Sequence, residues 1–448
     1  MRKFYVFLFS LVVFATGIHA QTEKTIDVTD DLTTAIENSV DGDIFILKPG
    51  IHVANDRTTI IPHNITIKSE AGMDQTLLYI AQFDVPANGQ SFILEGLEIT
   101  GARVDSASGV ELPLDTLNGS DKYVVNLISS SLEPTDGAYN TFEDIVIQSC
   151  HLRNFDRSVI RGDRDTYTAK DILIDDCIVH DFRGAGDYGP FRFKSRIKFD
   201  NFITTNSTFY DIYCSFYDCQ DQTSNQTTYR VENCTFYNWG GKPGGGKYLF
   251  DIKNNDLATL IIKSCILGKT NVVDDDPTFV AYGFRFMDEA TAEIGFTAMN
   301  PDFYIPETKL GYTEANWDKD EYNTTDMDPA WADPENGDFT LPEGSDFLQM
   351  SPEGTIIGDP RWDPEYGVGI AHVIAKSSIS LYPNPAMDYV NLELDRDAFI
   401  TVYAITGQKV MHTRLEKGTQ QMSIEGLTPG VYFVSSDTGT ESVKLLIK

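Results

Sequence analysis

The sequence predicts an all-β protein in which a parallel β-helix is followed by a small C-terminal β-sandwich. The first observation is a phrase that recurs between Ile145 and Lys269, with equivalent positions 27, 30, 27 and 31 residues apart. These equivalent positions are Cys150, Cys177, Ser207, Cys234 and Cys265. Self-similarity at such a period predicts a stacked repeat architecture. The second observation is a change after residue 379, where short alternating strands are separated by Gly and Pro turns.

Each copy of the phrase predicts two strands joined by a tight corner. Apolar residues alternate as in 145–147, a polar pair follows as in 148–149, and alternation resumes at the Cys or Ser position. The second residue of each pair is Asp, Asn or Ser, whose side chain forms hydrogen bonds with the backbone of the turn. A second corner is predicted at Asn154, Asp181, Asp211 and Asn238. The remainder of each period holds a third strand and a variable loop, which makes one coil of a β-helix.

The two ends of the chain predict export and a capped solenoid. Residues 1–20 carry Arg2 and Lys3 before an apolar run, which is the pattern of a secretory signal peptide. No later segment approaches 18 continuous apolar residues, so we expect no membrane span. The β-helix domain is assigned to residues 21–370 with a capping helix near 32–40. A linker follows at 371–379, and residues 380–448 form the sandwich.

Charge and cysteine usage narrow the range of partners and cofactors. The formal net charge of −32 argues against nucleic acid or an anionic membrane as a partner. Four of the six cysteines occupy one inward repeat position, which favours buried core thiols over the alternative of a full disulfide set. No zinc-type spacing is present, so we expect no metal site. The stretch Asp274–Asp276 is interpreted either as a calcium site or as a solvated acidic turn. We expect the protein to be a monomer.

Three phrases in the first domain resemble a known group of secreted proteins. The stretch 42–50, Gly-Asp-Ile-Phe-Ile-Leu-Lys-Pro-Gly, resembles the start of pectate-lyase-like β-helices. The phrases at 338–341 and 358–362 resemble the closing coils of secreted Bacteroidetes β-helix proteins of the chondroitinase B and alginate lyase-like group. This resemblance covers roughly residues 25–365 and implies a right-handed parallel β-helix.

The second domain resembles the C-terminal sorting domain of the Bacteroidetes type IX secretion system. The resemblance rests on Tyr-Pro-Asn-Pro at 382–385, Thr-Gly-Gln at 406–408 and Leu-Thr-Pro-Gly-Val-Tyr-Phe-Val at 427–434. It implies that the chain is secreted, or attached to the cell surface, through the type IX secretion machinery. It also implies that this domain has no catalytic role.

A basic island interrupts the acidic chain and predicts where a substrate would bind. Ten of the 46 residues from 153 to 198 are Lys or Arg, against 35 of 448 in the whole chain. Aligning the coils predicts two outward columns of side chains. The first contains Arg161, then Arg192 or Lys194, then Tyr217 and Asp251, and the second contains Arg153, His180, Tyr210 and Tyr237.

These columns carry groups suited to elimination in a uronic-acid polymer. Such chemistry needs a cation to neutralise the carboxylate, a base for the C5 proton and an acid for the leaving oxygen. The lyase resemblance implies a Lys base assisted by Arg, which assigns Lys194 and Arg161, with Tyr217 or His180 as the acid. The predicted substrate contacts are Arg192, Arg164, Arg153, His180, Tyr210 and Tyr237. The alternative for each basic residue is ion pairing with a neighbouring Asp.

The expected function is that of a secreted carbon–oxygen lyase acting on an anionic polysaccharide or oligosaccharide by β-elimination. A dehydratase acting on uronic oligosaccharides would use the same proton abstraction. A glycan-binding or surface protein without activity is the alternative from another class. A hydrolase ranks third, because Asp163, Asp187, Asp218 and Asp251 form no convincing catalytic set.

Overall fold

The computed structural model divides the chain into two compact units, residues 1–363 and residues 364–448. The described residues are 22–104, 110–112, 120–162, 167–184, 188–194, 198–220, 226–240, 248–252, 257–269, 282–285, 291–294, 297–299, 317–318, 323–324, 328–351, 354–366, 379–382, 386, 389–394, 398–404, 409–415, 417–428, 430–436 and 442–447. The predicted signal peptide lies outside them. Each unit is treated by itself below.

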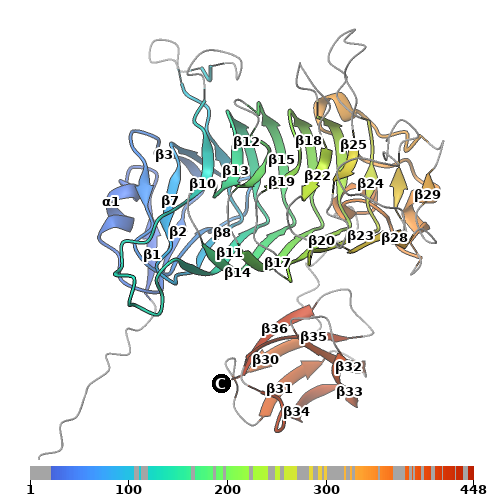
Figure 1. Cartoon of the computed structure of the whole chain (residues 1–448). Coiled ribbons are helices and arrows are strands. Elements are labelled where there is room, and N and C mark those ends of the chain that lie inside the picture. Colours follow the sequence, from blue (N-terminus) through green and yellow to red (C-terminus); the bar gives the residue numbers. More distant parts are fainter. Residues whose placement is uncertain are drawn as a thin grey trace, which may run out of the picture. The chain divides into compact units, whose positions relative to one another are not determined.

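Three parallel sheets wind through the first unit and confirm the predicted β-helix (Figure 1). Sheet A contains β1 Glu23–Ile26, β2 Asp43–Leu47, β5 Ile65–Ser69, β8 Phe92–Glu95, β11 Thr141–Gln148, β14 Thr168–Asp175, β17 Lys198–Thr205, β20 Thr228–Glu232, β23 Thr259–Lys263, β26 Thr291–Ile294 and β28 Trp317–Asp318. Sheet B contains β3 Gly50–Ala54, β6 Thr76–Ile80, β9 Glu98–Thr100, β12 His151–Phe155, β15 Ile178–Phe182, β18 Thr208–Ile212, β21 Thr235–Trp239, β24 Ile266–Leu267, β27 Ala298–Met299 and β29 Asn323–Thr324. Sheet C contains β4 Thr59–Ile60, β7 Phe83–Pro86, β10 Tyr123–Ile128, β13 Ser158–Arg161, β16 Phe191–Lys194, β19 Tyr217–Gln220, β22 Tyr248–Ile252 and β25 Tyr282–Arg285.

Each coil has left-handed backbone at two positions, one between the strands of sheets A and B and one just before the last residue of the sheet B strand. The second residue of each predicted polar pair has a φ between 48° and 54°. These residues are Ser149, Asp176, Asn206, Asn233 and Ser264. The predicted second corner is also left-handed, with φ between 51° and 61° at Asn154, Asp181, Asp211 and Asn238. Asn and Asp tolerate this region better than other side chains, which explains the residue types in the repeat.

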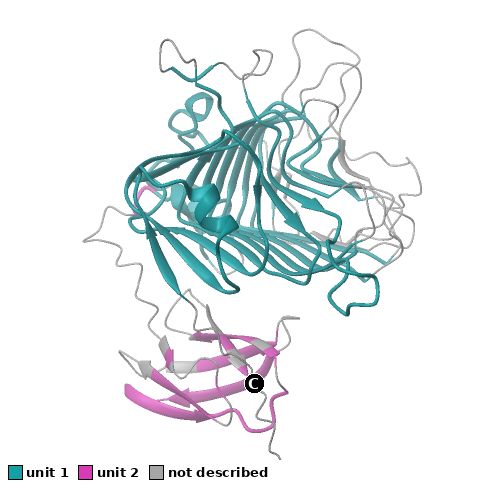
Figure 2. Ribbon diagram, turned by 90° about the vertical axis from the view of Figure 1, so that its left-hand side faces the viewer, with its two compact units in different colours: residues 1–363 teal, residues 364–448 magenta. Residues whose placement is uncertain are grey.

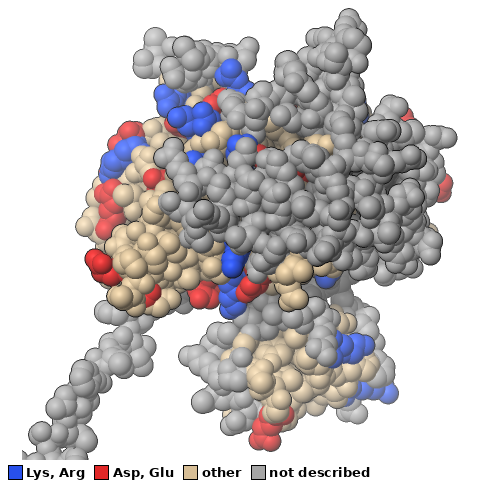
Figure 3. Space-filling view, viewed as in Figure 1, with Lys and Arg blue, Asp and Glu red and all other residues tan. Residues whose placement is uncertain are grey.

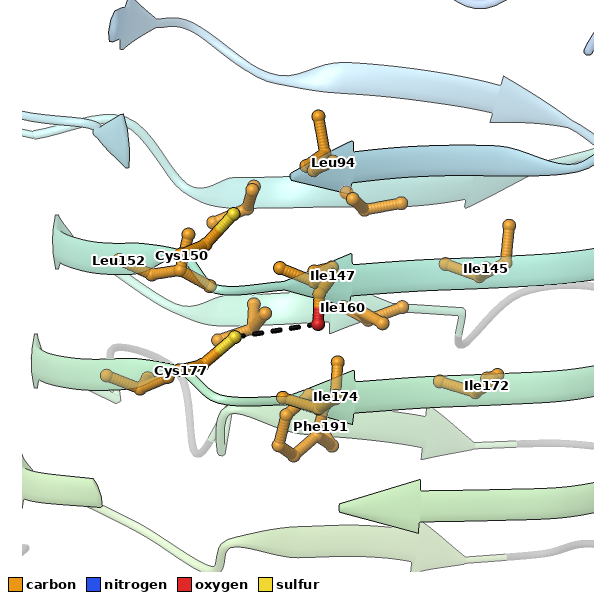
Figure 4. Packing of buried hydrophobic residues seen from close by; sticks show 14 of the residues in the cluster. Leu94, Ile145, Ile147, Cys150, Leu152, Ile160, Ile172, Ile174, Cys177 and Phe191 are labelled. Carbon is orange, nitrogen blue, oxygen red and sulfur yellow. Dashed lines mark hydrogen bonds between the residues drawn. The ribbon is translucent and has the colours of Figure 1, made fainter. Parts of the chain in front are cut away.

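Inward side chains stack in columns because neighbouring coils pair in register. Leu94, Ile147 and Ile174 form one such column on sheet A, and each is fully buried (Figure 4). All six cysteines are buried and free, as expected for core thiols. The Cys177 thiol donates to the Ile147 carbonyl oxygen at 3.5 Å, which joins two coils (Figure 4). Aliphatic and thiol columns together make one continuous hydrophobic core.

A short helix covers the N-terminal end of the core. Helix α1, Leu32–Glu37, begins after Asp31, whose carboxylate accepts from the Thr34 backbone N–H at 2.9 Å. Its Leu32 and Ile36 side chains are buried against the first coils, and the helix crosses the end of the solenoid (Figure 2). The predicted capping helix is therefore present.

The predicted closing coils differ from the structure. Residues 328–366 run across the outward face of sheet B as turns and three 3₁₀ helices, Pro334–Asn336, Asp346–Gln349 and Pro360–Trp362. Asp359 and Arg361 attach this closing segment to the coils. The Asp359 carboxylate accepts from Thr208 Oγ1 at 2.7 Å, and the Arg361 guanidinium bridges Asp359 at 2.9 Å and Asp176 at 2.6 Å. The conspicuous phrase at 358–362 is therefore an attachment to sheet B.

The second unit consists of two antiparallel sheets around their own core, as a β-sandwich requires. One sheet contains β30 Ile379–Tyr382, β31 Tyr389–Leu394 and β34 Gly418–Ser423. The other contains β32 Ala398–Ala404, β33 Lys409–Leu415, β35 Gly430–Ser436 and β36 Ser442–Ile447. Val390, Val402 and Leu445 are fully buried between them.

The attachment of the closing segment predicts a pH-dependent contribution to stability. Burial outweighs the neighbouring Arg361 and raises the pKa of Asp359 from its usual value near 3.8 to about 6. Between these values the folded state keeps a proton that the unfolded state has lost, so stability falls as pH rises. A difference of about 2 units corresponds to about 3 kcal/mol. All four tryptophans lie in the first unit, so urea unfolding followed by tryptophan fluorescence reports on it alone.

Asp359→Asn is expected to remove this decline between pH 4 and pH 7 while lowering stability at both, because one acceptor oxygen is lost. Asp74→Asn, at an exposed position, serves as the matched control. An identical pH dependence in the wild type and in Asp359→Asn would contradict the assignment.

Candidate functional site

The outward face of sheet C carries a column of polar and charged side chains, here called the sheet C ladder. Its members come from successive coils in the order Asp84, Asn126, Arg161, Arg192, Asp218 and Asp251. The five from Asn126 onward are each at most 7% exposed. Inward neighbours on the same strands, such as Phe191 and Phe250, belong to the hydrophobic core. Strand alternation thus separates a charged outer column from an apolar inner one.

Hydrogen bonds between coils hold the ladder in place. The Asn126 amide donates to Asp84 at 2.8 Å and accepts from Arg161 Nη1 at 2.9 Å. On the next coils the Arg192 guanidinium forms an ion pair with Asp218 at 2.5 Å. Buried charges are costly unless they are paired and hydrogen-bonded. The network therefore fixes two guanidinium groups one coil apart on the outward face.

Two tyrosine rings contact the arginines of this face. The Arg161 guanidinium carbon lies 5.3 Å from the Tyr123 ring centroid, and that of Arg192 lies 4.0 Å from the Tyr188 centroid. Arg157 contacts both rings, at 6.0 Å and 4.7 Å, and donates to the Tyr123 hydroxyl at 3.0 Å. Such cation–π contacts orient planar guanidinium groups. Arg157 and Tyr188 are only half-buried, so they are the groups of this cluster that a ligand would reach first.

The first predicted column is correct for three residues and wrong for one. Arg161, Arg192 and Asp251 occupy the ladder as expected. Tyr217 does not, because it pairs with Phe191 and Phe250 in the inward column and is fully buried. Its hydroxyl lies 2.8 Å from Thr204 Oγ1, inside the core. Asp218 holds the outward position, so the expected role of Tyr217 as an acid is ruled out.

Two predicted residues fall partly or wholly outside the described structure. Lys194 is the last residue of β16, two positions after Arg192, and its backbone pairs with that of Gln220. Its side chain is outside the described residues. Arg164 lies outside them altogether.

The second predicted column exists, but on a different sheet. Register places Arg153, His180, Tyr210 and Tyr237 one above the next on the outward face of sheet B. The residues expected to bind substrate on sheet B therefore do not share a face with Arg161 and Arg192 on sheet C. The structure separates the predicted site into two surfaces.

Arg153 serves as an anchor within the chain. Its guanidinium binds Glu98 at 2.6 Å and Glu111 at 2.8 Å, and Glu111 also accepts from the Tyr79 hydroxyl at 2.7 Å. Glu111 belongs to the excursion between β9 and β10, so these contacts hold this residue of the excursion against sheet B. Burial alone would lower the pKa of Arg153, but the ion pairs with Glu111 and Glu98 outweigh it and raise that pKa.

His180 stacks between its neighbours and is only 12% exposed in its side chain. Its ring lies 4.5 Å from the Tyr210 ring and nearly parallel to it. Its Nδ1 contacts Asp181 and its Nε2 contacts His151 Nε2, each at 2.7 Å. Burial, followed by the charge of His180, lowers the pKa of His151 to about 3. These contacts give His180 a structural role within the fold.

Tyr210 and Tyr237 lie beneath the closing segment and are 9% and 7% exposed. Both rings pack against Phe339, and the Tyr237 hydroxyl donates to Glu335 at 2.6 Å. The same burial raises the pKa of both phenols. Their aromatic faces are used in packing, which leaves little surface for a sugar.

Several residues of the sheet C face escaped sequence reasoning. Asn126 and Tyr123 belong to β10, which precedes the first clear copy of the repeated phrase. Tyr188 and Arg157 lie in connections where the phrase does not apply. Strand register could have located these residues, because the sheet C strands of successive coils can be aligned at Val125, Ile160 and Phe191.

Among the described residues no group of three or more His, Cys, Asp or Glu side chains is arranged to hold a metal ion. The acidic stretch Asp274–Asp276, where calcium was left open, lies outside them. Burial raises the pKa of the Cys150 thiol to about 12 and those of Cys177 and Cys234 well above their usual range, so these cysteines are poor ligands. In the part of the chain that the structure describes, no helix has the length and apolar content needed to cross a membrane.

Comparisons with known proteins assign the second unit and describe part of the first. Residues 380–448 match the family of secretion system C-terminal sorting domains. Residues 229–362 match a domain of unknown function, DUF5123, and this range joins the last described coils to the closing segment. No curated protein matches the chain. The protein is therefore secreted or held at the cell surface by type IX secretion, and its sorting domain interacts with that machinery.

The Arg192–Asp218 pair predicts a strong energetic coupling. Arg192→Met alone leaves a buried carboxylate without its ion-pair partner and is expected to cost about 3–5 kcal/mol. Arg192→Met with Asp218→Leu replaces both charges and is expected to cost less than the single variant. Urea unfolding followed by tryptophan fluorescence measures both. A double variant less stable than Arg192→Met would refute a buried pair at this position.

Proposed function

We propose that the outward face of sheet C binds an anionic, uronic-acid-containing polysaccharide or oligosaccharide and cleaves it by β-elimination. The observation that carries this proposal is the fixed pair Arg161 and Arg192 with Tyr188 beside it. Guanidinium groups match carboxylates in geometry, and buried, preorganised donors stabilise charge that develops during a reaction. Delivery outside the cell supports an extracellular polymer as the substrate.

Each residue of the face has a chemical role in this proposal. Arg161 and Arg192 are at most 7% exposed, so they act on the uronate carboxylate through their positive charge, which acidifies the C5 proton. Lys194, which the lyase resemblance assigns as the base, removes that proton. The C4–oxygen bond then breaks as the C4–C5 double bond forms. Tyr188 takes the role first expected of Tyr217 and donates a proton to the leaving oxygen.

A glycan-binding protein without activity is the second candidate. Arg161 and Arg192 already bond Asn126 and Asp218 within the chain, and such satisfied groups suit binding as well as catalysis. A dehydratase acting on uronic oligosaccharides would share the elimination step. Product formation separates these candidates, because binding alone leaves the polymer intact.

The test is an ultraviolet assay for the unsaturated uronate product with alginate, ulvan, pectin and glycosaminoglycans. The wild-type protein is expected to raise the absorbance with at least one polymer. Lys194→Ala and Tyr188→Phe are each expected to lower the rate by about 10²-fold or more, because each removes a proton-transfer group. Lys170→Ala and Tyr217→Phe are the matched controls, since Lys170 is exposed on sheet A and Tyr217 is in the core.

No absorbance change across the panel with folded protein would sink the lyase proposal. Retardation of the same protein in glycan-containing gels would then support binding alone. Equal losses in Tyr188→Phe and Tyr217→Phe would show that the phenol of Tyr188 has no role in proton transfer.

A further inference from the structure

A cluster of exposed and half-buried cations lies where three consecutive coils pass from sheet B to sheet C. We call it the basic corner, and it comprises Arg103, Lys122, Arg157 and Arg183. Backbone hydrogen bonds stack these connections, with Arg157 N–H donating to the Lys122 carbonyl oxygen at 3.1 Å. Lys and Arg side chains gather at the upper edge of this face (Figure 3).

Among the described residues, the basic corner has a local excess of positive charge. Its four cations face two carboxylates, Asp121 and Asp156, among the described residues of these connections. The nearby Glu111 is bound to Arg153 on the sheet B side. In a chain with a net charge of −32, such an excess raises the local concentration of anions.

The ion pairs of the corner differ from those of the ladder. Arg183 and Arg157 lie 3.6 Å and 3.8 Å from Asp156, and the Arg183 and Arg103 side chains are 43% and 48% exposed. The Arg192–Asp218 pair is 2.5 Å long and buried. Exposed pairs of this kind contribute little to stability, about 0–1 kcal/mol. Arg183 and the exposed Lys122 can therefore turn to an incoming anion at small cost to the fold, whereas Arg103 is held by Asp121 at 2.8 Å and Arg157 by the Tyr123 hydroxyl at 3.0 Å.

Arg157 connects the corner with the ladder, whereas Arg103, Lys122 and Arg183 contact neither the Tyr123 nor the Tyr188 ring among the described contacts. Arg157 directly precedes β13 and Arg161 ends it, so their Cα atoms are at most roughly 13 Å apart. Arg157 contacts the Tyr123 and Tyr188 rings that also cover the ladder arginines. A continuous line of cationic groups thus leads from the ladder to the exposed corner.

We propose that the basic corner is a second oxyanion subsite, which binds a sulfate or carboxylate group on a glycan residue other than the one held at the ladder. The inference rests on the proposed function, because it requires that another anionic sugar residue of the same glycan binds the outward face of sheet C. Two linked contacts on one chain raise affinity through effective concentration. The protein therefore binds an anionic polymer in preference to a short oligosaccharide.

The test compares two size series from disaccharide to decasaccharide, oligogalacturonates with carboxylates only and heparin oligosaccharides with sulfates. Affinities are measured by titration calorimetry on the full-length secreted chain. The variant Arg103→Gln/Lys122→Gln/Arg183→Gln removes three corner cations and leaves Arg157 in place. The control Lys48→Gln/Arg57→Gln/Lys170→Gln removes three exposed cations elsewhere, with the same change in net charge.

The wild type is expected to bind the longest member of one series at least about tenfold more tightly than its disaccharide. The corner variant should lose that gain and keep its disaccharide affinity, while the control keeps both. The series that shows the loss identifies sulfate or carboxylate as the anion. Equal affinities of the corner and control variants at every length overturn the subsite alone. Wild-type protein that binds neither series overturns the subsite, and the ultraviolet assay with alginate and ulvan then decides the proposed function separately.

Discussion

Left-handed backbone at two positions in each coil is the constraint on which the β-helix depends. A non-glycine residue in this conformation costs roughly 1 kcal/mol or more, so each corner needs local compensation. Coil-to-coil hydrogen bonds supply it: the Asn206 amide donates to Asp175, and that of Asn233 donates to Asn206. Because the side-chain period of a strand is two, a corner displaced by one residue would turn the core outward. The corners therefore determine both the core columns and the outer ladders.

This constraint explains which parts could be predicted from the sequence. Sheets A and B are joined by a corner of fixed length, so the repeated phrase predicted their register, including the order of His180 and Tyr210 on sheet B. Each sheet C strand follows a connection of variable length. The repeated phrase therefore does not determine which of two adjacent residues of that strand points outward. Phe216 and Tyr217 are both aromatic, and the predicted alignment was wrong by one position. It placed Tyr217 in the outward column, where the structure has Asp218.

Long-range partners account for the remaining differences. Arg153 is held by Glu111 of an excursion, and Arg361 reaches Asp176 across a separation of 185 residues. Local sequence shows a basic residue in each case but not the carboxylate that the fold places beside it. The packing of Phe339 on Tyr210 could not be predicted for the same reason. The local sequence around an outward aromatic residue does not show whether solvent or a distant segment covers it. Arg153 and Arg361 thus join distant segments of the chain, whereas Arg161 and Arg192 belong to sheet C.

The stacked thiols have a consequence for a protein that works outside the cell. Thiolate is the form that oxidants attack, and burial in the solenoid keeps Cys150, Cys177 and Cys234 protonated and out of reach. Small, polarizable side chains fill the narrow inner columns, and none of the six takes part in a disulfide. Resistance to the oxidising surroundings is therefore a property of the wound coils themselves, and it lasts as long as the coils stay closed.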